Sequence, residues 1–257
     1  LAGNIPMVGI HDILMTYISG NISVIKYSDK DKVLIQWMIQ QLNTIDPRSA
    51  QYFEEVERLV DVDAVIATGS DNSSRYFEAY FGKYPNIIRK NRNSVAIVSK
   101  ESNEDELRNL SKDIFDYFGL GCRNVSKVYL QTGLDMDMLM RVLDENKEVM
   151  YHNKYRNNYD YNLSLFLLNK KEFLQNGTIL LLKDEGLASR IATLHFEWFD
   201  NIDRLESQLN LQLEKIQCIV SNIALTNLPY LPFGGSQCPS IADFADGVDT
   251  MQFLLDL

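Results

Sequence analysis

Short runs of β-branched and apolar residues alternate along the chain with segments whose apolar residues recur at helical spacing. This alternation restricts the fold more than any other feature, because each run can form a buried strand and each segment a helix. Two of the helical segments span residues 29–45 and 102–121. The runs around them are "NISVIKYS" (21–28), "VDAVIATGS" (62–70), "SVAIVS" (94–99) and "SKVYLQ" (126–131). Strands and helices at this spacing predict an α/β fold with a largely parallel sheet.

Two of the predicted helices carry clear end signals. Gly20 predicts the end of the helix that starts at residue 11, because glycine adopts the left-handed conformation that closes many helices. Asn103 and Glu106 form a capping-box pattern at the start of the second helix. Gly119 is expected to end that helix.

The remaining elements follow from the same patterns. In the helix over 29–45, Val33, Trp37 and Leu42 are expected to face roughly one way. Another helix is expected over 200–216. Later strands are expected at 162–169, 177–183, 192–199 and 216–222.

Composition excludes several classes of protein. With 257 residues, 46% of them apolar, the chain can bury a core and shows no signature of long disorder. Its net charge of −10 argues against binding the phosphate backbone of a nucleic acid. No run of 18 apolar residues is present to form a transmembrane helix, and the first residues lack the features of a signal peptide. The chain starts without methionine and reads like mid-domain sequence, so an earlier part of a longer protein is expected.

The cysteines and histidines bear on compartment and metal binding. Cys122, Cys218 and Cys238 are odd in number, widely spaced and without a CxxC pair, which favours a reducing cytosol and a cytoplasmic protein. The three histidines show no metal-ligand spacing, so no metal site is expected. Cys218 lies within an apolar strand and is expected in the core. Cys238, in a proline-flanked loop, is an alternative nucleophile to Cys122.

Cys122 lies in the stretch "FGLGCRNVSKVYL", in a short connection from a predicted helix to a predicted strand. Gly119 and Gly121 would let a substrate approach the thiol closely, and the charge of Arg123 would lower its pKa. These features suit a nucleophile. An inert, buried thiol is the commoner role of an isolated cysteine, so the residue types alone leave both roles open.

Four segments, in the same order, resemble the aldehyde dehydrogenase superfamily. "GLGCRNVSKVYL" resembles its cysteine motif, in which Gly-x-x-Cys ends a helix and leads into a strand. The other three are "AGNIPMVGIHDILMTYISGNISVIKYSD", "VIATGSDNSSRYF" and "LPFGGSQCPS". "NKYRNNYDYN" (153–162) and "GGSQCPSIADFADGVDT" (234–250) are similar to one branch, the LuxC-type acyl-CoA reductases.

The resemblance implies an aldehyde-dehydrogenase-like α/β fold, with a Rossmann-like parallel-sheet cofactor domain and an α/β catalytic domain. Residues 1–88 would be the later part of the cofactor domain, and 89–229 the catalytic domain with the cysteine. Residues 230–257 would return to the cofactor domain. The implied activity is reduction of an acyl-CoA or acyl-protein thioester to an aldehyde.

In that reaction Cys122 would carry the acyl group, and Asn4 would donate a hydrogen bond to the oxyanion. Without the resemblance, Asn4 reads as a turn residue before a proline. The backbone N–H of Cys122 would be the second donor.

The resemblance also implies a nicotinamide cofactor, with NADPH expected and NAD left open. Lys26 would reach the ribose or a phosphate, and Gly69 and Ser70 would lie against the pyrophosphate. Glu185 would hold the nicotinamide ribose, although a solvated turn carboxylate is the alternative. Asp29 could instead favour NAD by repelling a 2′-phosphate.

One departure separates the chain from aldehyde-oxidising members. Those enzymes have a Leu-Glu-Leu-Gly-Gly segment whose glutamate activates water, whereas the equivalent "NIIRKNRNS" (86–94) has no carboxylate. This absence favours the reductase branch. Two alternatives stay open: an aldehyde dehydrogenase that uses NAD(P), and a non-catalytic subunit that binds an acyltransferase or synthetase. A homodimer is a further expectation.

Overall fold

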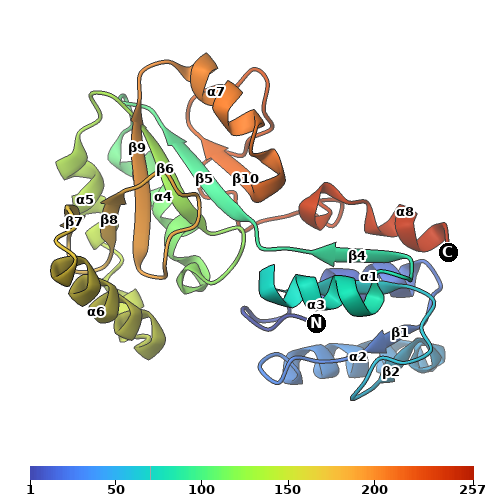
Figure 1. The fold of residues 1–257 in the computed structure, drawn as a ribbon. Helices are drawn as coiled ribbons and strands as arrows, with labels where there is room; N and C mark the ends of the chain where they lie inside the picture. The colour runs from blue at the N-terminus through green and yellow to red at the C-terminus, as the bar shows by residue number, and fades with distance from the viewer. Residues whose placement is uncertain (70) are drawn as a thin grey trace. The chain divides into compact units, whose positions relative to one another are not determined.

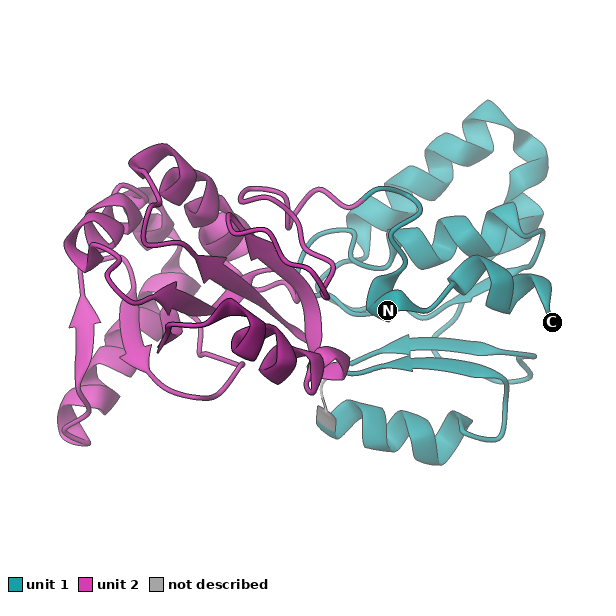
Figure 2. Ribbon diagram, turned by 90° about the horizontal axis from the view of Figure 1, so that it is seen from above, with its two compact units in different colours: residues 1–91, 240–257 teal, residues 92–239 magenta. Residues whose placement is uncertain are grey.

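The computed structural model describes residues 1–69 and 71–257. The chain divides into two compact units, which Figure 2 shows in teal and magenta. Unit 1 contains Leu1–Asn91 and Ser240–Leu257, and unit 2 contains Arg92–Pro239. The roles expected for the domains, cofactor binding and catalysis, stay predictions.

Unit 2, all of whose residues are described, is built on a sheet of six strands (Figure 1). In spatial order the strands are β10 (Ile216–Ser221), β5 (Asn93–Val98), β6 (Val125–Gln131), β9 (Thr193–Phe199), β8 (Leu180–Lys183) and β7 (Phe173–Gln175). Neighbours run parallel except β7, which pairs antiparallel with β8. The expected α/β class with a largely parallel sheet is confirmed.

Helices cover both faces of this sheet. Those on one face are α4 (Glu104–Phe115), α5 (Met136–Asp144) and α6 (Asn153–Leu168), and α7 (Ile202–Asn210) lies on the other. The strands alternate accordingly, since Ala96 and Val98 belong to the first core and Val95 and Ile97 to the second. The short 3₁₀ helices of the unit are η2 (Asp116–Gly119), η3 (Lys147–Tyr151) and η4 (Leu213–Lys215).

Helix α4 begins as expected and ends early. The Asn103 side chain accepts the N–H of Glu106, and the Glu106 side chain accepts the N–H of Asn103, both at 3.0 Å. The helix ends at Phe115 rather than at Gly119. Tyr117 and Phe118 then take φ values of 52° and 58°, and Gly119 follows at 69°. The chain therefore makes a left-handed turn before it reaches the cysteine.

The prediction of a strand at 162–169 is wrong, because these residues complete helix α6 and the turn after it. The buried residues of this helix are Tyr155, Tyr159, Asn162 and Phe166, which share one face at helical spacing. Leu168 is 81% exposed. The apolar run thus combines core residues with exposed leucines at the end of the helix. The apolar content of so short a run does not show whether it forms a helix or a strand.

Unit 1 is built from shorter elements. In chain order they are α1 (Ile10–Ile18), β1 (Ser23–Ile25), α2 (Val33–Ile45), η1 (Pro47–Tyr52), β2 (Phe53–Glu55), β3 (Val65–Thr68), α3 (Asp71–Phe81), β4 (Asn86–Arg89), η5 (Ala245–Gly247) and α8 (Thr250–Leu255). In its described residues, β1 pairs in parallel with β2, and β3 with β4.

Gly20 ends α1 as expected. Its φ is 82°, its N–H donates to Tyr17, and the N–H of Asn21 donates to Thr16. These two hydrogen bonds form a Schellman motif. The prediction of which face of α2 is buried is wrong. Ile35 and Ile39 enter the core, while Val33 and Trp37 are exposed.

The C-terminal segment is attached to α1 and β4. His11 Nε2 lies 2.8 Å from the carbonyl of Ile241, and α8 contacts α1. Arg89, at the end of β4, pairs with Asp12 of α1 at 2.5 Å and donates to the hydroxyl of Thr250 at 3.0 Å. This ion pair, only 6% and 13% exposed, joins β4, α1 and α8.

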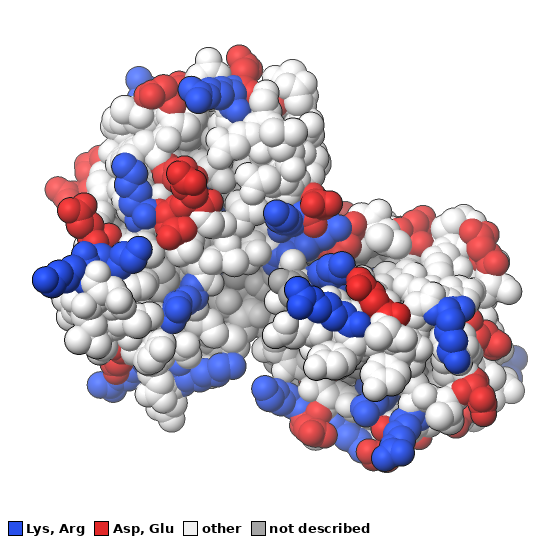
Figure 3. Space-filling view, viewed as in Figure 1, with Lys and Arg blue, Asp and Glu red and all other residues white. Residues whose placement is uncertain are grey.

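The surface mixes charges of both signs. Figure 3 shows lysine and arginine side chains interspersed with aspartate and glutamate over the visible face. In the described part of the chain, no helix combines the length and apolar character needed to cross a bilayer.

Candidate active site

Cys122 lies in a tight turn between η2 and β6, which we call the cysteine turn (residues 121–124). The N–H of Asn124 donates to the carbonyl of Gly121 at 3.1 Å and closes the turn. Cys122 and Arg123 are therefore its two central residues, and the side chain of Cys122 is exposed. The expected loop position of the cysteine is confirmed.

The side chain of Asn124 fixes this turn through hydrogen bonds. Its side-chain oxygen accepts the N–H of Gly121 at 2.9 Å, and its amide donates to the carbonyls of Asp116 at 2.6 Å and Asp113 at 3.2 Å. Asn124 is only 4% exposed. One buried amide thus satisfies carbonyls at the end of α4 and also holds the first residue of the cysteine turn.

Ser94 holds the cysteine itself. Its hydroxyl lies 2.9 Å from the carbonyl of Cys122 and 3.0 Å from the sulfur of Cys218. Cys218 is half-buried, so the expectation of a core cysteine holds only in part. Burial raises the pKa of the Cys218 thiol, which the hydrogen bond from Ser94 and the charge of Arg123 partly counteract.

Asp113 joins the cysteine turn to the loop that contains "PFGGS". Its carboxylate accepts the N–H groups of Gly234 at 2.6 Å and Ser236 at 2.9 Å. Arg123 donates to the carbonyl of Ser236 at 3.2 Å. Burial raises the pKa of Asp113, against the opposing effect of these N–H donors. Two motifs more than 100 residues apart in the sequence are thus bonded together within unit 2.

The expected cofactor residues of unit 1 lie at the carboxyl ends of strands. Lys26 follows β1 and is exposed, and Gly69 follows β3 directly. A Cβ on Gly69 would lie 2.8 Å from that of Ser73 and 2.9 Å from the ring of Phe77. Only glycine therefore lets α3 begin so close to the strand. An exposed cation and a helix start at strand carboxyl ends fit a phosphate-bearing cofactor. Ser70 lies outside the described residues.

The remaining expected site residues are divided between the units. Asn4 lies in an exposed bend of unit 1, and Glu185 in an exposed loop of unit 2 after β8. Within unit 2, the structure brings Cys122 together with Ser94, Asn124 and Arg123. Ser94 and Asn124 were not among the site residues expected from the sequence.

A small cavity of about 70 Å³ adjoins the cysteine turn. Its lining includes Gly121, Asn124, Ser126, Tyr155 and Arg190. This volume is about half that of an apolar cavity of roughly 150 Å³ that holds one benzene molecule, so the cavity is too small for a fatty acyl chain.

A family model for acyl-CoA reductase (LuxC) matches residues 1–146, more than half of the chain. The chain belongs to the LuxC family of acyl-CoA reductases. The match in this LuxC-family chain includes Asn4, Lys26, Gly69 and Cys122, while Glu185 lies beyond it. No curated protein sequence matches the chain.

Solved structures with a similar fold include aldehyde dehydrogenases. A bifunctional proline utilization A (PutA) protein is 14% identical, with a TM-score of 0.62, over 81% of this chain and 26% of its own. A putative aldehyde dehydrogenase from Burkholderia cenocepacia is 14% identical, with a TM-score of 0.61, over 84% of this chain and 56% of its own. A lactaldehyde dehydrogenase is 16% identical, with a TM-score of 0.59, over 85% and 55%. The LuxC-family chain thus has the aldehyde dehydrogenase fold and spans about a quarter to about half of these proteins.

Proposed function

We propose that the protein reduces an acyl-CoA, or another acyl thioester, to an aldehyde through an acyl-enzyme on Cys122. The observation that carries this proposal is the cysteine turn, which exposes Cys122 while Ser94 and Asn124 hold its backbone. A nucleophile on a fixed turn can meet a carbonyl with little loss of conformational entropy. Membership of the LuxC family supports the choice of substrate class.

In the first step the Cys122 thiolate attacks the thioester carbonyl, and collapse of the adduct expels the carrier thiol, which takes up a proton. The backbone N–H of Cys122 and the side chain of Asn4 would donate to the oxyanion. One such donor is worth about 3–4 kcal/mol of barrier. The hydrogen bond from Ser94 to the Cys122 carbonyl fixes one peptide group of the cysteine turn.

In the second step the acyl-enzyme carbonyl accepts the hydride that a reduced nicotinamide, NADPH by the family resemblance, supplies when bound. Collapse of the thiohemiacetal then releases the aldehyde and regenerates the Cys122 thiolate. Lys26 and Gly69, at the carboxyl ends of β1 and β3, would hold the cofactor. Glu185 would hold the nicotinamide ribose.

The segment 86–94 favours reduction over oxidation. It contains no carboxylate that could activate water. Its residue Arg89 is buried and pairs with Asp12, so this arginine is committed to holding unit 1 together. The absence of a carboxylate from this segment disfavours hydrolysis of a thioester on Cys122.

The test is reduction of a fatty acyl-CoA by the full-length protein, followed by loss of NADPH and by aldehyde formation. Cys122→Ala should lower turnover at least about 10³-fold, and Cys238→Ala, at the other exposed cysteine, should leave it unchanged. Unchanged turnover in Cys122→Ala refutes the proposal. Steady production of free acid from aldehyde and NAD would instead identify an aldehyde dehydrogenase.

A further inference from the structure

The loop that contains Glu185 is held by side chains from two neighbouring strands. It leaves β8 at Asp184 and runs to the start of β9. Lys127 Nζ donates to the carbonyl of Asp184, and His195 Nδ1 lies 2.8 Å from the carbonyl of Gly186. The Ser126 hydroxyl donates to the carbonyl of Leu187 at 2.7 Å. We call Ser126, Lys127 and His195 the loop clamp.

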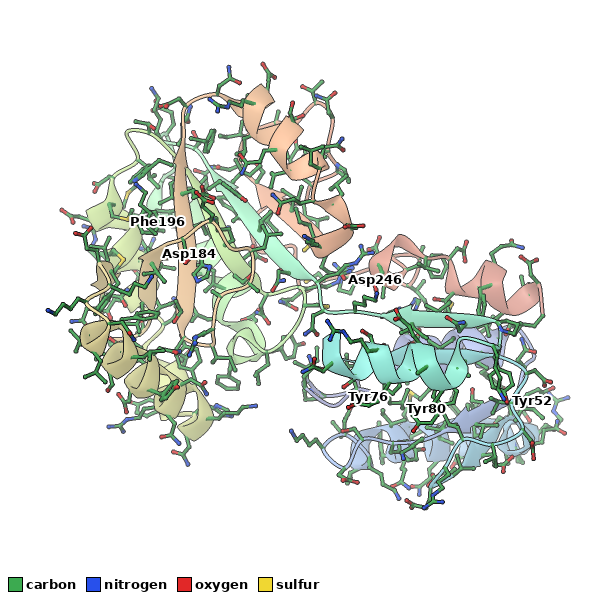
Figure 4. All side chains as sticks on the ribbon, in the orientation of Figure 1. Tyr52, Tyr76, Tyr80, Asp184, Phe196 and Asp246 are labelled. Atoms are coloured by element: carbon green, nitrogen blue, oxygen red, sulfur yellow. The ribbon has the colours of Figure 1, made fainter. Side chains whose placement is uncertain are left out.

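The strand register places the clamp residues together. Lys127 on β6 is the partner of His195 on β9, which in turn is the partner of Leu182 on β8. Paired residues of adjacent parallel strands project from the same face of the sheet, so Lys127 and His195 lie side by side under the loop. Figure 4 shows Asp184 next to Phe196 of β9, whose carbonyl accepts the Asp184 N–H at 3.4 Å.

The loop has a fixed local shape around Glu185. The Asp184 side chain accepts the N–H of Gly186 at 2.8 Å, which makes Glu185 the central residue of an Asx turn. This hydrogen bond is the main reason that the pKa of Asp184 lies below its ordinary range. The clamp holds the carbonyls on both sides of Glu185, while the Glu185 side chain is exposed.

Lys127 is an unusual residue to bury. Its side chain is fully buried, and burial lowers its pKa. Glu197, 2.7 Å away, and the ring of Tyr129, 5.3 Å away, partly offset the loss of water. Lys127 also donates to the carbonyl of Asp184, so this buried cation holds one conformation of the loop backbone.

We propose that Lys127, supported by Ser126 and His195, is a positioning residue that fixes the Glu185 carboxylate for binding the cofactor ribose. This inference rests on the proposed function, because the ribose is that of the nicotinamide cofactor. Lys127 touches the loop backbone and reaches the cofactor only through Glu185.

The test compares Lys127→Met, Glu185→Gln and their double variant in the full-length protein by the Kd for NADPH. Each single change should weaken binding by about tenfold, the effect of one hydrogen bond to a charged group. The double variant should bind no more weakly than either single one, since both changes remove the same contact. Additive losses, or an unchanged Kd in Lys127→Met, overturn the proposal.

Val128→Ala is the matched control, because Val128 is the next residue of β6 and belongs to the opposite core. It should lower thermal stability and leave the Kd for NADPH unchanged. If Lys127→Met fails to fold, Ser126→Ala removes one clamp hydrogen bond and should raise the Kd in the same direction. An unchanged Kd in Ser126→Ala then overturns the proposal.

Hydrogen exchange separates this inference from the proposed function. Without cofactor, the amide of Gly186 should exchange faster in Lys127→Met than in the wild type or in Val128→Ala. Unchanged exchange refutes the clamp even if the wild type reduces thioesters. A wild type that reduces no thioester refutes the proposed function, and the exchange rates still decide whether Lys127 holds the loop.

Discussion

The side-chain oxygen of Asn124 accepts the N–H of Gly121 at 2.9 Å, so the last residue of the cysteine turn also holds its first. The other half of the same amide donates to the carbonyl of Asp116 at 2.6 Å. A side chain with both a donor and an acceptor is required at this position. Asn124 therefore connects the end of α4 to the candidate nucleophile.

Asn124→Ala should destabilise the protein by about 1–3 kcal/mol, because it leaves a partly buried N–H and the buried carbonyls of Asp113 and Ile114 without their partner. We also expect slower acylation of Cys122, since the turn that displays the thiol loses a hydrogen bond to its first residue. Urea unfolding measures the first effect, and release of CoA thiol without NADPH measures the second.

Asn169→Ala is the control for this change. Asn169 also donates from its side chain to a backbone carbonyl, that of Leu165 at 2.7 Å, but it is exposed at the end of α6. Its replacement should leave the acylation rate unchanged. An acylation rate in Asn124→Ala that equals the wild-type rate would mean that Asn124 has only a structural role.

The Asp113 carboxylate predicts a pH dependence of stability. Burial raises its pKa above the ordinary value of 3.8, so the folded state binds its proton more tightly than the unfolded state does. The contribution of Asp113 to the free energy of unfolding therefore falls as pH rises from 3.8 to the raised pKa, and is constant above it.

Asp113→Asn removes this titration and should flatten the corresponding part of the profile of unfolding free energy against pH. Urea unfolding of both proteins at a series of pH values gives the difference. The variant replaces one acceptor oxygen with an NH₂ group, so it should also loosen Gly234 or Ser236 at every pH. A difference between the two proteins that does not change with pH contradicts the raised pKa.

The ion pair between Arg89 and Asp12 predicts a large effect in unit 1. Arg89→Met leaves the Asp12 carboxylate without its partner in a mostly buried position, at a cost of about 3–5 kcal/mol. The double variant Arg89→Met/Asp12→Asn should recover part of this loss, because it removes the unpaired charge. Thermal unfolding of the wild type, Arg89→Met, Asp12→Asn and the double variant completes a double-mutant cycle.

The adjacent residue offers the control for that cycle. Lys90 pairs with Glu78 at 3.0 Å, but the two side chains are 59% and 51% exposed. Lys90→Met should change stability by no more than about 1 kcal/mol. Equal effects of the Arg89 and Lys90 substitutions would show that burial does not strengthen the first pair.

Local signals in the sequence predicted the parts of the fold that depend on near neighbours. The capping box of Asn103 and Glu106 and the glycine closure at Gly20 are both present, since each needs only residues within one turn. The face of α2 was mispredicted because apolar residues surround that helix, and only tertiary contacts select Ile35 and Ile39 for the core. The short strands β2 and β4 lacked a long apolar run to mark them.

The candidate site was likewise predictable only where it depends on residues close together in the sequence. The cysteine motif placed Cys122 in a loop, because the flanking glycines and the following strand lie within a few residues. Its partners were not predictable: Ser94 is 28 residues away, and the bonds from Asp113 to Gly234 and Ser236 join residues 121 and 123 positions apart. Asn124 lies within the motif, but its hydrogen bonds depend on the early end of α4 at Phe115.

The three cysteines are expected to differ in reactivity towards iodoacetamide at neutral pH. Cys122 and Cys238 are exposed, whereas Cys218 is half-buried and hydrogen-bonded to Ser94. Burial also raises the pKa of the Cys218 thiol. A raised pKa leaves less thiolate at neutral pH, so Cys218 should be alkylated most slowly. Saturating acyl-CoA should protect Cys122, because the acylated sulfur cannot react, and should leave Cys238 unprotected. Mass spectrometry of the tryptic peptides measures each rate, and protection of Cys238 in place of Cys122 would assign the acyl group to the other thiol.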